Sequence, residues 1–236
     1  MVPSLEQIRL PLRLKESASF SNFYPDGNEE LVGILQSMRN PLTGKVVYLH
    51  GPDGSGKSHL LQAACKASLD EATSAFYVSL AIDGVHPELL LDLSAYGLIC
   101  LDDVDSVAGD GSWEEALLTL YESILSSGGS LVIAGRYPPG QGRFQLPDLA
   151  TRLASGGVWA VQPLSEEDVP HAMQLRARER GIEIPDAVTA YLMRRMPRDT
   201  GTLFSLLDEI DEQAFAHQRR LTVPFVRDLA ARLLSE

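Results

Sequence analysis

The sequence has few cysteines, no excess of positive charge and no long hydrophobic run. Only 2 of its 236 residues are cysteines, and both Cys65 and Cys100 fall in apolar patterns, so we expect reduced core thiols rather than a disulfide or metal site. No apolar run approaches the roughly 20 residues that cross a bilayer. No signal-peptide pattern is present either. We therefore expect a cytoplasmic protein that makes no membrane contact.

Negative charge dominates the chain. It carries 32 Asp and Glu against 20 Lys and Arg, a formal net charge of -12. Such a surface repels phosphate backbones, so we expect no strong direct binding to duplex DNA. The hydrophobic fraction of 44% is ordinary for a globular protein. The length allows one large domain, or a core domain with a small second one.

Short apolar segments predict the strands of an α/β domain. They are continuous rather than alternating, which is typical of strands buried on both faces of a parallel sheet. They lie at residues 45–50, 75–80, 97–102, 130–135 and 158–162. Between them, one face of a helix at 57–69 collects Leu60, Leu61, Ala64, Cys65 and Leu69. One face of a helix at 113–125 collects Ala116, Leu117, Leu120, Tyr121 and Leu125. Alternating strands and helices predict a doubly wound α/β fold.

After Gln162 the pattern becomes entirely helical. Ser165 is a suitable N-cap for a helix that Gly181 ends, and further helical patterns follow with short connections. Thr222 and Pro224 are suited to the start of the last one. We therefore place an α/β core at residues 15–162 and a helical subdomain at 163–236.

A phosphate-binding loop follows the first predicted strand. The segment GPDGSGKS, residues 51–58, fits G-x-x-x-x-G-K-[ST] between a strand and a helix. Glycines allow successive N–H groups to face phosphate oxygens, and the helix N-terminus adds positive potential. Lys57 would reach the β- and γ-phosphates of ADP or ATP, and Ser58 would ligate Mg²⁺. The loop residues assigned to the nucleotide are Gly51, Pro52, Asp53, Gly54, Ser55, Gly56, Lys57 and Ser58.

A pair of acids ends the third predicted strand. The segment LICLDD, residues 98–103, is apolar up to Asp102 and Asp103. Asp102 is placed to hold Mg²⁺, directly or through water, and Asp103 to orient or deprotonate the attacking water. Glutamate is the commoner second acid in such ATPases, so Asp103 leaves the strength of hydrolysis open.

Taken together, the motifs resemble the DnaA/Hda family of AAA+ ATPases. The resemblance is carried by SFSNFYPDGNEEL, GKSHL, LDDVDSVAGD, LPDLATRLASG, VQPLSEEDVPHAMQLRARERGIEIP and QRRLTVPFV. It implies a P-loop AAA+ parallel five-stranded sheet flanked by helices, followed by a small all-helical lid. From LPDLATRL onward the match favours the branch that inactivates DnaA. DnaA and the DNA polymerase III β sliding clamp are then the implied partners.

The resemblance implies a catalytic role for Arg152. This residue matches the arginine finger, which reaches across a subunit interface to stabilise the γ-phosphate bound by a neighbour. A surface arginine in a salt bridge is the alternative. Assembly through that edge leaves a homo-oligomer open. Arg136 lies where the family has a polar sensor, and Gly201 lies where a lid arginine is usual, with Arg198 one turn earlier as a substitute. Both departures favour weak hydrolysis of the protein's own nucleotide.

The resemblance also implies nucleotide contacts outside the G-x-x-x-x-G-K-[ST] motif. Phe23, Tyr24 and Asn28 belong to the segment that packs on adenine, and His59 to the phosphate loop. Core packing is the alternative for Phe23.

The segment QIRLPL resembles the peptide by which family members dock on the clamp. Gln7 offers an amide, Leu10 and Leu12 fill an apolar groove, and Pro11 favours an extended shape. We therefore assign residues 1–14 as a clamp-docking tail; a strand folded back on the core is the alternative.

Three functional hypotheses follow. In the first, the ADP-bound protein docks on clamp–DNA and triggers hydrolysis of DnaA-bound ATP through Arg152. In the second, the chain is a stand-alone ATPase, such as a DnaC-like helicase loader. In the third, it is a non-catalytic adaptor that binds nucleotide only to stabilise its fold.

Overall fold

A parallel sheet forms the centre of the protein. The computed structural model describes residues 18–38, 44–71, 73–141, 143–195, 201, 203–204, 206–207, 209–210 and 221–233. The five strands lie in the order β2-β3-β4-β1-β5. Their bounds are β1 Val46–His50, β2 Ala75–Ser79, β3 Leu98–Asp102, β4 Ser130–Gly135 and β5 Gly157–Ala160. The predicted strands are confirmed, with small differences at their ends.

The central strands β1, β3 and β4 are buried on both faces, which explains their continuous apolar runs. The edge strand β5 was expected to be buried as well, but it is largely exposed because it has a neighbour on one side only. In β3, Leu98 and Cys100 pack into the cluster on one face, whereas Ile99 and Leu101 pack into the cluster on the other. β1 pairs in parallel with β4 on one side and β5 on the other, so its residues are central. A strand in that position has no face left for polar side chains.

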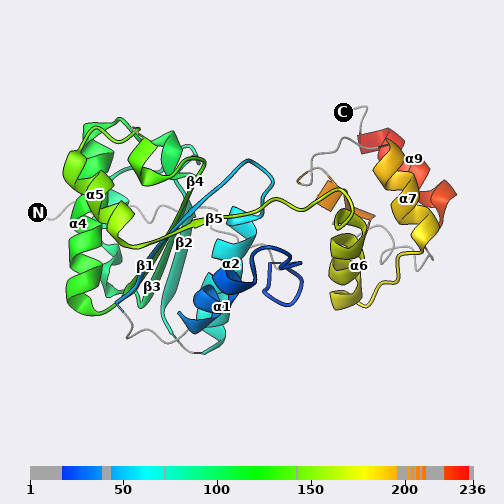
Figure 1. Ribbon diagram of the computed structural model, residues 1–236, viewed down its shortest axis with the longest axis horizontal. Coiled ribbons are helices and arrows are strands. Elements are labelled where there is room, and N and C mark those ends of the chain that lie inside the picture. The colour runs from blue at the N-terminus through cyan, green and yellow to red at the C-terminus, as the bar shows by residue number, and fades with distance from the viewer. Residues whose placement is uncertain are drawn as a thin grey trace, which may run out of the picture.

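Helices cover the two faces of the sheet as separate layers (Figure 1). One layer holds α1 (Glu29–Ser37) and α2 (Lys57–Asp70); the other holds α4 (Gly111–Ser127) and α5 (Pro147–Ser155). The shorter helices are α3 (Glu88–Leu91), η2 (Leu93–Ala95), η3 (Val104–Ser106) and η4 (Pro139–Gln141).

The predicted helix faces are confirmed except at their ends. Leu69 and Leu125 were expected in the core, but they are 46% and 38% exposed. Both lie in the last turn of their helices, beyond the edge of the sheet.

The two cysteines lie in the core as free thiols, as expected. Cys65 and Cys100 are buried and free, and burial raises the pKa of the Cys65 thiol to about 11. No helix among the described residues combines the length and apolar character needed to span a bilayer.

A second, helical unit follows the sheet and lies at one end of the molecule (Figure 1). Its helices are α6 (Val169–Glu179), α7 (Asp186–Arg195) and α9 (Val223–Leu233). They surround a core of their own that includes Met173, Val188, Leu192, Leu207, Ile210 and Val226. Ser165 accepts a hydrogen bond at its Oγ from the Asp168 N–H at 3.1 Å, just ahead of α6. We call this unit the lid.

Candidate functional site

The phosphate-binding loop connects β1 to α2 with the geometry that the motif predicts. Gly56 is the N-cap of α2 and has a φ of 99°. A Cβ at Gly56 would lie 2.8 Å from Cε2 of Phe23. Only glycine fits both the left-handed backbone and this close approach. The loop thereby brings the N-terminus of α2 against the segment that contains Phe23.

Lys57 is held inside the loop. It is 9% exposed, and its Nζ donates hydrogen bonds to the carbonyl oxygens of Gly51 and Pro52, each at 2.8 Å. Burial lowers the pKa of the Lys57 ammonium, while the negative charges of Asp53 and the acids that follow β3 oppose this change. The loop carbonyl oxygens thus hold the Lys57 amine beside the cavity that this residue lines.

The loop also contains a buried polar atom suited to an anion. Ser55 is 5% exposed, and its Oγ has no hydrogen-bond partner among the described residues. A buried hydroxyl without a partner is costly, and a phosphate oxygen would satisfy it. The loop therefore fits a phosphorylated ligand by its own chemistry.

Asp102 and Ser58 meet at the end of β3, as the metal prediction requires. Asp102 is 1% exposed and accepts a hydrogen bond from Tyr77 Oη at 2.9 Å, and Gln62 Nε2 donates to that hydroxyl at 3.1 Å. Burial and the neighbouring Asp103 raise the pKa of Asp102, whereas a hydrogen bond from the Ser58 hydroxyl opposes the rise. A carboxylate held at such cost is suited to a cation.

The metal-binding capacity of this pair is limited. Within the described part of the chain no cluster of three or more His, Cys, Asp or Glu residues could hold a metal ion. Mg²⁺ commonly takes one or two protein ligands and completes its shell with phosphate oxygens and water. Ser58 and Asp102 fit that pattern.

Asp103 has a strained backbone and a partner on β2. Its φ is 55°, and it is the one non-glycine residue with positive φ in the described chain. Its carboxylate accepts a hydrogen bond from Ser79 Oγ at 2.6 Å. The side chain lines the cavity beside the loop, so the predicted second acid lies at the site but is engaged by Ser79.

The end of β4 leaves no space for a sensor side chain. A Cβ at Gly135 would lie 2.6 Å from Tyr48 Oη and 2.9 Å from Asp105 Oδ2. Arg136, the next residue, donates its N–H to Asp105 and extends its guanidinium to Asp53, with Nη1 3.5 Å from Oδ2. Arg136, which the sequence analysis aligned with the polar sensor of the family, is thus paired with the phosphate loop.

A cavity of about 380 Å³ lies between the core and the lid beside this loop. From the core it is lined by Phe23, Tyr24 and residues 53–59, and from the lid by Ala172, Arg176, Gly201 and Phe204. Of the predicted loop residues, Gly51 and Pro52 do not line the cavity. Their carbonyl oxygens instead accept the hydrogen bonds that hold Lys57.

Aromatic side chains form one end of the cavity. The rings of Phe23 and His59 are 5.6 Å apart. Tyr24 stacks on His171 of the lid at 6.3 Å, and its hydroxyl donates to Asp168 Oδ1 at 3.4 Å. These rings are placed as a platform for a flat base would be.

Asn28 lines the cavity but its amide serves the backbone. Its Nδ2 donates to the Gln162 carbonyl at 3.0 Å, and its Oδ1 accepts from the Gln162 N–H at 2.9 Å. The amide thereby joins the start of α1 to the segment that leaves β5 for the lid. The structure therefore gives this amide a structural role, and its predicted contact with adenine stays a prediction.

The sequence analysis missed Arg176. This residue lies on α6 and lines the same cavity, with Nη2 2.5 Å from Nδ1 of His59 and its Cζ 4.1 Å from the centroid of the Phe204 ring. Nothing local marks it, because arginines are common on helices; only the position of α6 over α2 brings it to the site.

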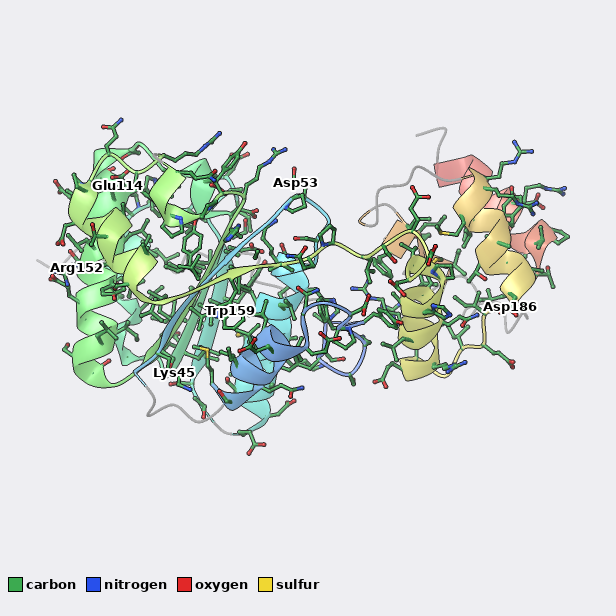
Figure 2. The ribbon with its side chains drawn as sticks, viewed as in Figure 1. Lys45, Asp53, Glu114, Arg152, Trp159 and Asp186 are labelled. Atoms are coloured by element: carbon green, nitrogen blue, oxygen red, sulfur yellow. The ribbon has the colours of Figure 1, made fainter. Side chains whose placement is uncertain are left out.

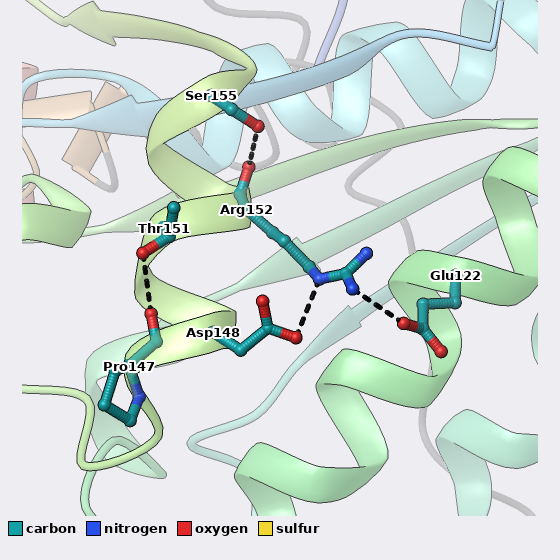
Figure 3. Close-up of polar contacts among 6 residues, drawn as sticks. All are labelled: Glu122, Pro147, Asp148, Thr151, Arg152 and Ser155. Atoms are coloured by element: carbon teal, nitrogen blue, oxygen red, sulfur yellow. Dashed lines mark hydrogen bonds and ion pairs between the residues drawn. The ribbon is translucent and has the colours of Figure 1, made fainter.

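Arg152 lies far from this cavity, on α5 at the other end of the molecule from the lid (Figure 2). Its Nε is 3.0 Å from Asp148 Oδ2 and its Nη2 3.0 Å from Glu122 Oε1 (Figure 3). Its guanidinium also lies 6.0 Å from the centroid of the Tyr121 ring. The side chain is 37% exposed.

Glu114 fixes the start of the helix that carries Arg152. It is 1% exposed, and its carboxylate accepts the N–H groups of Gly109 at 2.7 Å, Gln145 at 3.0 Å and Leu146 at 2.6 Å. Leu146 is the N-cap of α5. A buried α4 carboxylate thus holds the loop that enters α5. Sequence reasoning missed it, since its partners lie 31 and 32 residues away.

Several predicted residues lie outside the described part of the chain. They are Gln7, Leu10, Pro11, Leu12 and Arg198.

Comparison with known proteins extends this picture. Residues 166–229 match the family model described as "Hda, lid domain". Domain III of the replication initiation protein DnaA from Thermotoga maritima has a TM-score of 0.73, with 18% identity over 92% of this chain and 97% of that one. AMPPCP-bound DnaA from Aquifex aeolicus has a TM-score of 0.68, with 19% identity over 86% of this chain and 68% of that one.

The likeness extends to a DNA motor. The Holliday junction branch migration motor RuvB of Thermotoga maritima has a TM-score of 0.61, with 17% identity over 91% of this chain and 74% of that one. At such identities the solved structures establish the fold, which confirms the predicted P-loop AAA+ sheet with a helical lid.

Proposed function

We propose that this chain, an Hda-like AAA+ protein homologous to DnaA, regulates the initiation of bacterial chromosome replication by stimulating hydrolysis of DnaA-bound ATP. The observation that carries the proposal is the combination of an Hda-type lid on a DnaA-like core with an exposed arginine at the edge remote from the nucleotide cavity. The protein would act on a neighbour through that arginine.

In this proposal the cavity between core and lid binds ADP or ATP. The N-terminus of α2 and Lys57 bind the phosphates, Ser55 supplies a further donor, and Phe23 and Tyr24 flank the adenine. Ser58 and Asp102 would hold Mg²⁺, which neutralises phosphate charge. Binding to the native state alone would also stabilise the fold.

The chain's own hydrolysis would be weak. Asp103, the residue placed to orient or deprotonate water, is hydrogen-bonded to Ser79, and the end of β4 carries Arg136 in place of a polar sensor. A water-orienting carboxylate must be positioned toward the γ-phosphate to act. The protein would therefore hold its nucleotide, ADP in particular, as a lasting ligand.

Arg152 would serve as the arginine finger. Its guanidinium is exposed at the α4–α5 edge and is held by Asp148 and Glu122, both 55% exposed (Figure 3). Ion pairs at exposed sites are weak, so exchange of these carboxylates for a partner's γ-phosphate costs little. A positive charge delivered there stabilises the phosphoryl group in transfer.

Docking on the β sliding clamp would come from the tail at residues 1–14. Gln7, Leu10, Pro11 and Leu12 have the composition of a short clamp-docking peptide. This part of the proposal depends on the sequence alone, and the test includes an arm for it.

The test is ATP turnover by ATP-loaded DnaA with clamp loaded on DNA, with and without this protein. We expect stimulation that Arg152→Ala and deletion of residues 1–14 each abolish. Arg143→Ala, which removes another exposed arginine of the same face of the core, should stimulate as the wild type does.

Other outcomes identify the alternatives. Vigorous turnover by this protein alone, abolished by Lys57→Ala, would identify a stand-alone ATPase. Nucleotide binding without any effect on DnaA would leave a non-catalytic adaptor. Stimulation that persists in Arg152→Ala would contradict the finger assignment.

A further inference from the structure

We propose that Tyr77 of β2 is a positioning residue for the metal site of the bound nucleotide, because its hydroxyl fixes the carboxylate of Asp102. The inference rests on the proposed function, which assigns Ser58 and Asp102 to Mg²⁺. It adds a residue that neither the phosphate loop nor the acid pair contains. Tyr77 does not touch the metal ion; it acts through Asp102.

The register of the sheet brings Tyr77 to this carboxylate. β2 and β3 pair in parallel, with Tyr77 opposite Cys100 and Ser79 opposite Asp102. Side chains two positions apart in a strand point to the same face of the sheet, so Asp102 shares the face of Cys100. Tyr77 packs against the same cluster as Cys100, on the face that α2 covers. Its side chain is long enough to reach diagonally from β2 to the end of β3.

Both oxygens of the Asp102 carboxylate accept hydrogen bonds from the protein. Oδ2 accepts from Tyr77 Oη at 2.9 Å, and Oδ1 accepts from the N–H of Asp103 at 3.0 Å. With a donor on each oxygen, the plane of the carboxylate is fixed. Each carboxylate oxygen has two lone pairs, so acceptor capacity is left for a cation or for its water.

Gln62 sets the direction of the Tyr77 hydroxyl. Its Nε2 donates to Tyr77 Oη at 3.1 Å, and an amide NH₂ group can only donate. The hydroxyl therefore accepts from Gln62 and gives its single proton to Asp102. Hydrogen bonds in such a chain strengthen one another. Gln62 is 7% exposed and lies four residues after Ser58, so one face of α2 carries both a proposed metal ligand and the start of this chain.

The hydroxyl of Tyr77 is the part of the side chain that concerns the metal. The ring packs against buried residues that include Leu61 and Cys100, and phenylalanine would keep this packing. Mg²⁺ demands nearly ideal octahedral geometry, so a carboxylate that can rotate holds it less well. Groups that orient a ligating side chain typically contribute about 10–100-fold to metal affinity.

The experiment measures the affinity of Mn²⁺ for the full chain saturated with ADP, from the loss of the EPR signal of free Mn²⁺. Mn²⁺ takes the same oxygen ligands as Mg²⁺. We expect Tyr77→Phe to weaken Mn²⁺ about tenfold, and to bind ADP in EDTA as the wild type does. Tyr96→Phe is the matched control, because it removes the hydroxyl of another partly buried tyrosine, whose ring packs on Phe76. It should leave both affinities unchanged.

The inference fails if Tyr77→Phe binds Mn²⁺ as tightly as the wild type. It fails equally if ADP affinity in EDTA falls by the same factor, because the hydroxyl would then serve the packing of the core. Should Tyr77→Phe not fold, Gln62→Leu removes the donor to Tyr77 Oη and carries the same comparison, with a smaller loss of Mn²⁺ affinity expected.

Failure of the proposed function has a different signature. If the wild-type chain binds ADP but no Mn²⁺, the assignment of Ser58 and Asp102 to the metal is wrong. If it binds no ADP, the proposed nucleotide binding is wrong. Either result removes the role of Tyr77 as well, and both are seen in the wild type, before any variant is compared.

Discussion

The nucleotide cavity and the Arg152 edge hold their charged groups in opposite ways. At the phosphate loop and the end of β3, Lys57 is 9% and Asp102 1% exposed, and burial changes the pKa of both. At the edge, Arg152 is 37% exposed and its acidic partners 55% exposed. Burying a charge costs desolvation free energy, and its interaction with a partner is then strong. An exposed ion pair contributes little free energy, so its partner is easily exchanged.

The difference bears on the proposed function, in which one chain holds its own nucleotide and acts on that of a neighbour. The buried Lys57 and Asp102 are held by hydrogen bonds to other groups of the protein, which suits long-term retention of a ligand. Arg152, by contrast, is held only by exposed carboxylates, which a more strongly charged group of a partner would displace in the proposed function. The following predictions test this difference between the two regions.

The largest expected effect comes from Lys57→Ala. We expect about a hundredfold loss of ADP and ATP affinity, because the proposed function assigns this ammonium, now held by two loop carbonyl oxygens, to the phosphates. Isothermal titration calorimetry measures it. Lys45→Ala, which changes an exposed lysine ahead of β1, should bind normally. Similar affinity in the two variants would remove Lys57 from the site.

Glu114→Ala should weaken the edge and spare the cavity. The variant loses a buried carboxylate that accepts three backbone N–H groups, so we expect the free energy of unfolding to fall by about 3 kcal/mol. Thermal and denaturant unfolding measure the loss. Glu115→Ala, an exposed neighbour, is the control. ADP affinity of the folded protein should not change; a marked drop would show that the two regions are coupled.

Asp102→Asn should stabilise the protein in the absence of nucleotide. The raised pKa of Asp102 means that the folded state favours its protonated form, so its ionisation lowers stability once the pH exceeds the usual aspartate pKa of about 3.9. The gain in melting temperature should therefore be present at neutral pH and vanish as the pH falls below that value.

The same variant should lose Mg²⁺-dependent nucleotide affinity. Asp103→Asn, which changes the exposed neighbour, should show a smaller gain in melting temperature. A lower melting temperature for Asp102→Asn at neutral pH would contradict the prediction that the ionised Asp102 carboxylate lowers the stability of the folded protein.

The smallest expected effect is that of Arg152→Ala on the isolated protein. Its ion pairs are exposed, so we expect the melting temperature and the ADP affinity of the wild type. Glu122→Gln should behave alike. A clear fall in stability would show that Arg152 supports the α4–α5 packing, and its role toward a partner would then need separate proof.

Much of the core was predictable because its signals are local. A continuous apolar run such as residues 98–102 predicts a strand with both faces buried, and GPDGSGKS specifies a loop conformation that glycine makes accessible. Asp102 and Ser58 were assigned to Mg²⁺ from two local motifs, the phosphate loop and the acid pair that ends the third strand. Their hydrogen bond agrees with that assignment.

Contacts between distant segments were not predictable. The support of Asp102 by Tyr77, the burial of Glu114 against the loop before α5, and the placement of Arg176 over His59 each join elements far apart in the chain. A single arginine or glutamate on a helix has the same local pattern whether it faces solvent or a cavity. The free energy that selects between these positions comes from packing of whole elements.

The sequence by itself therefore determined which segments become strands, which loop can bind phosphate, and which residue types stand at its ends, since backbone preference and hydrophobic period act over a few residues. Tertiary structure decided which of the charged residues matter to the site. Packing of the core buries Lys57 and Asp102 and so changes their pKa values. The position of the lid over the core brings Arg176 to the cavity.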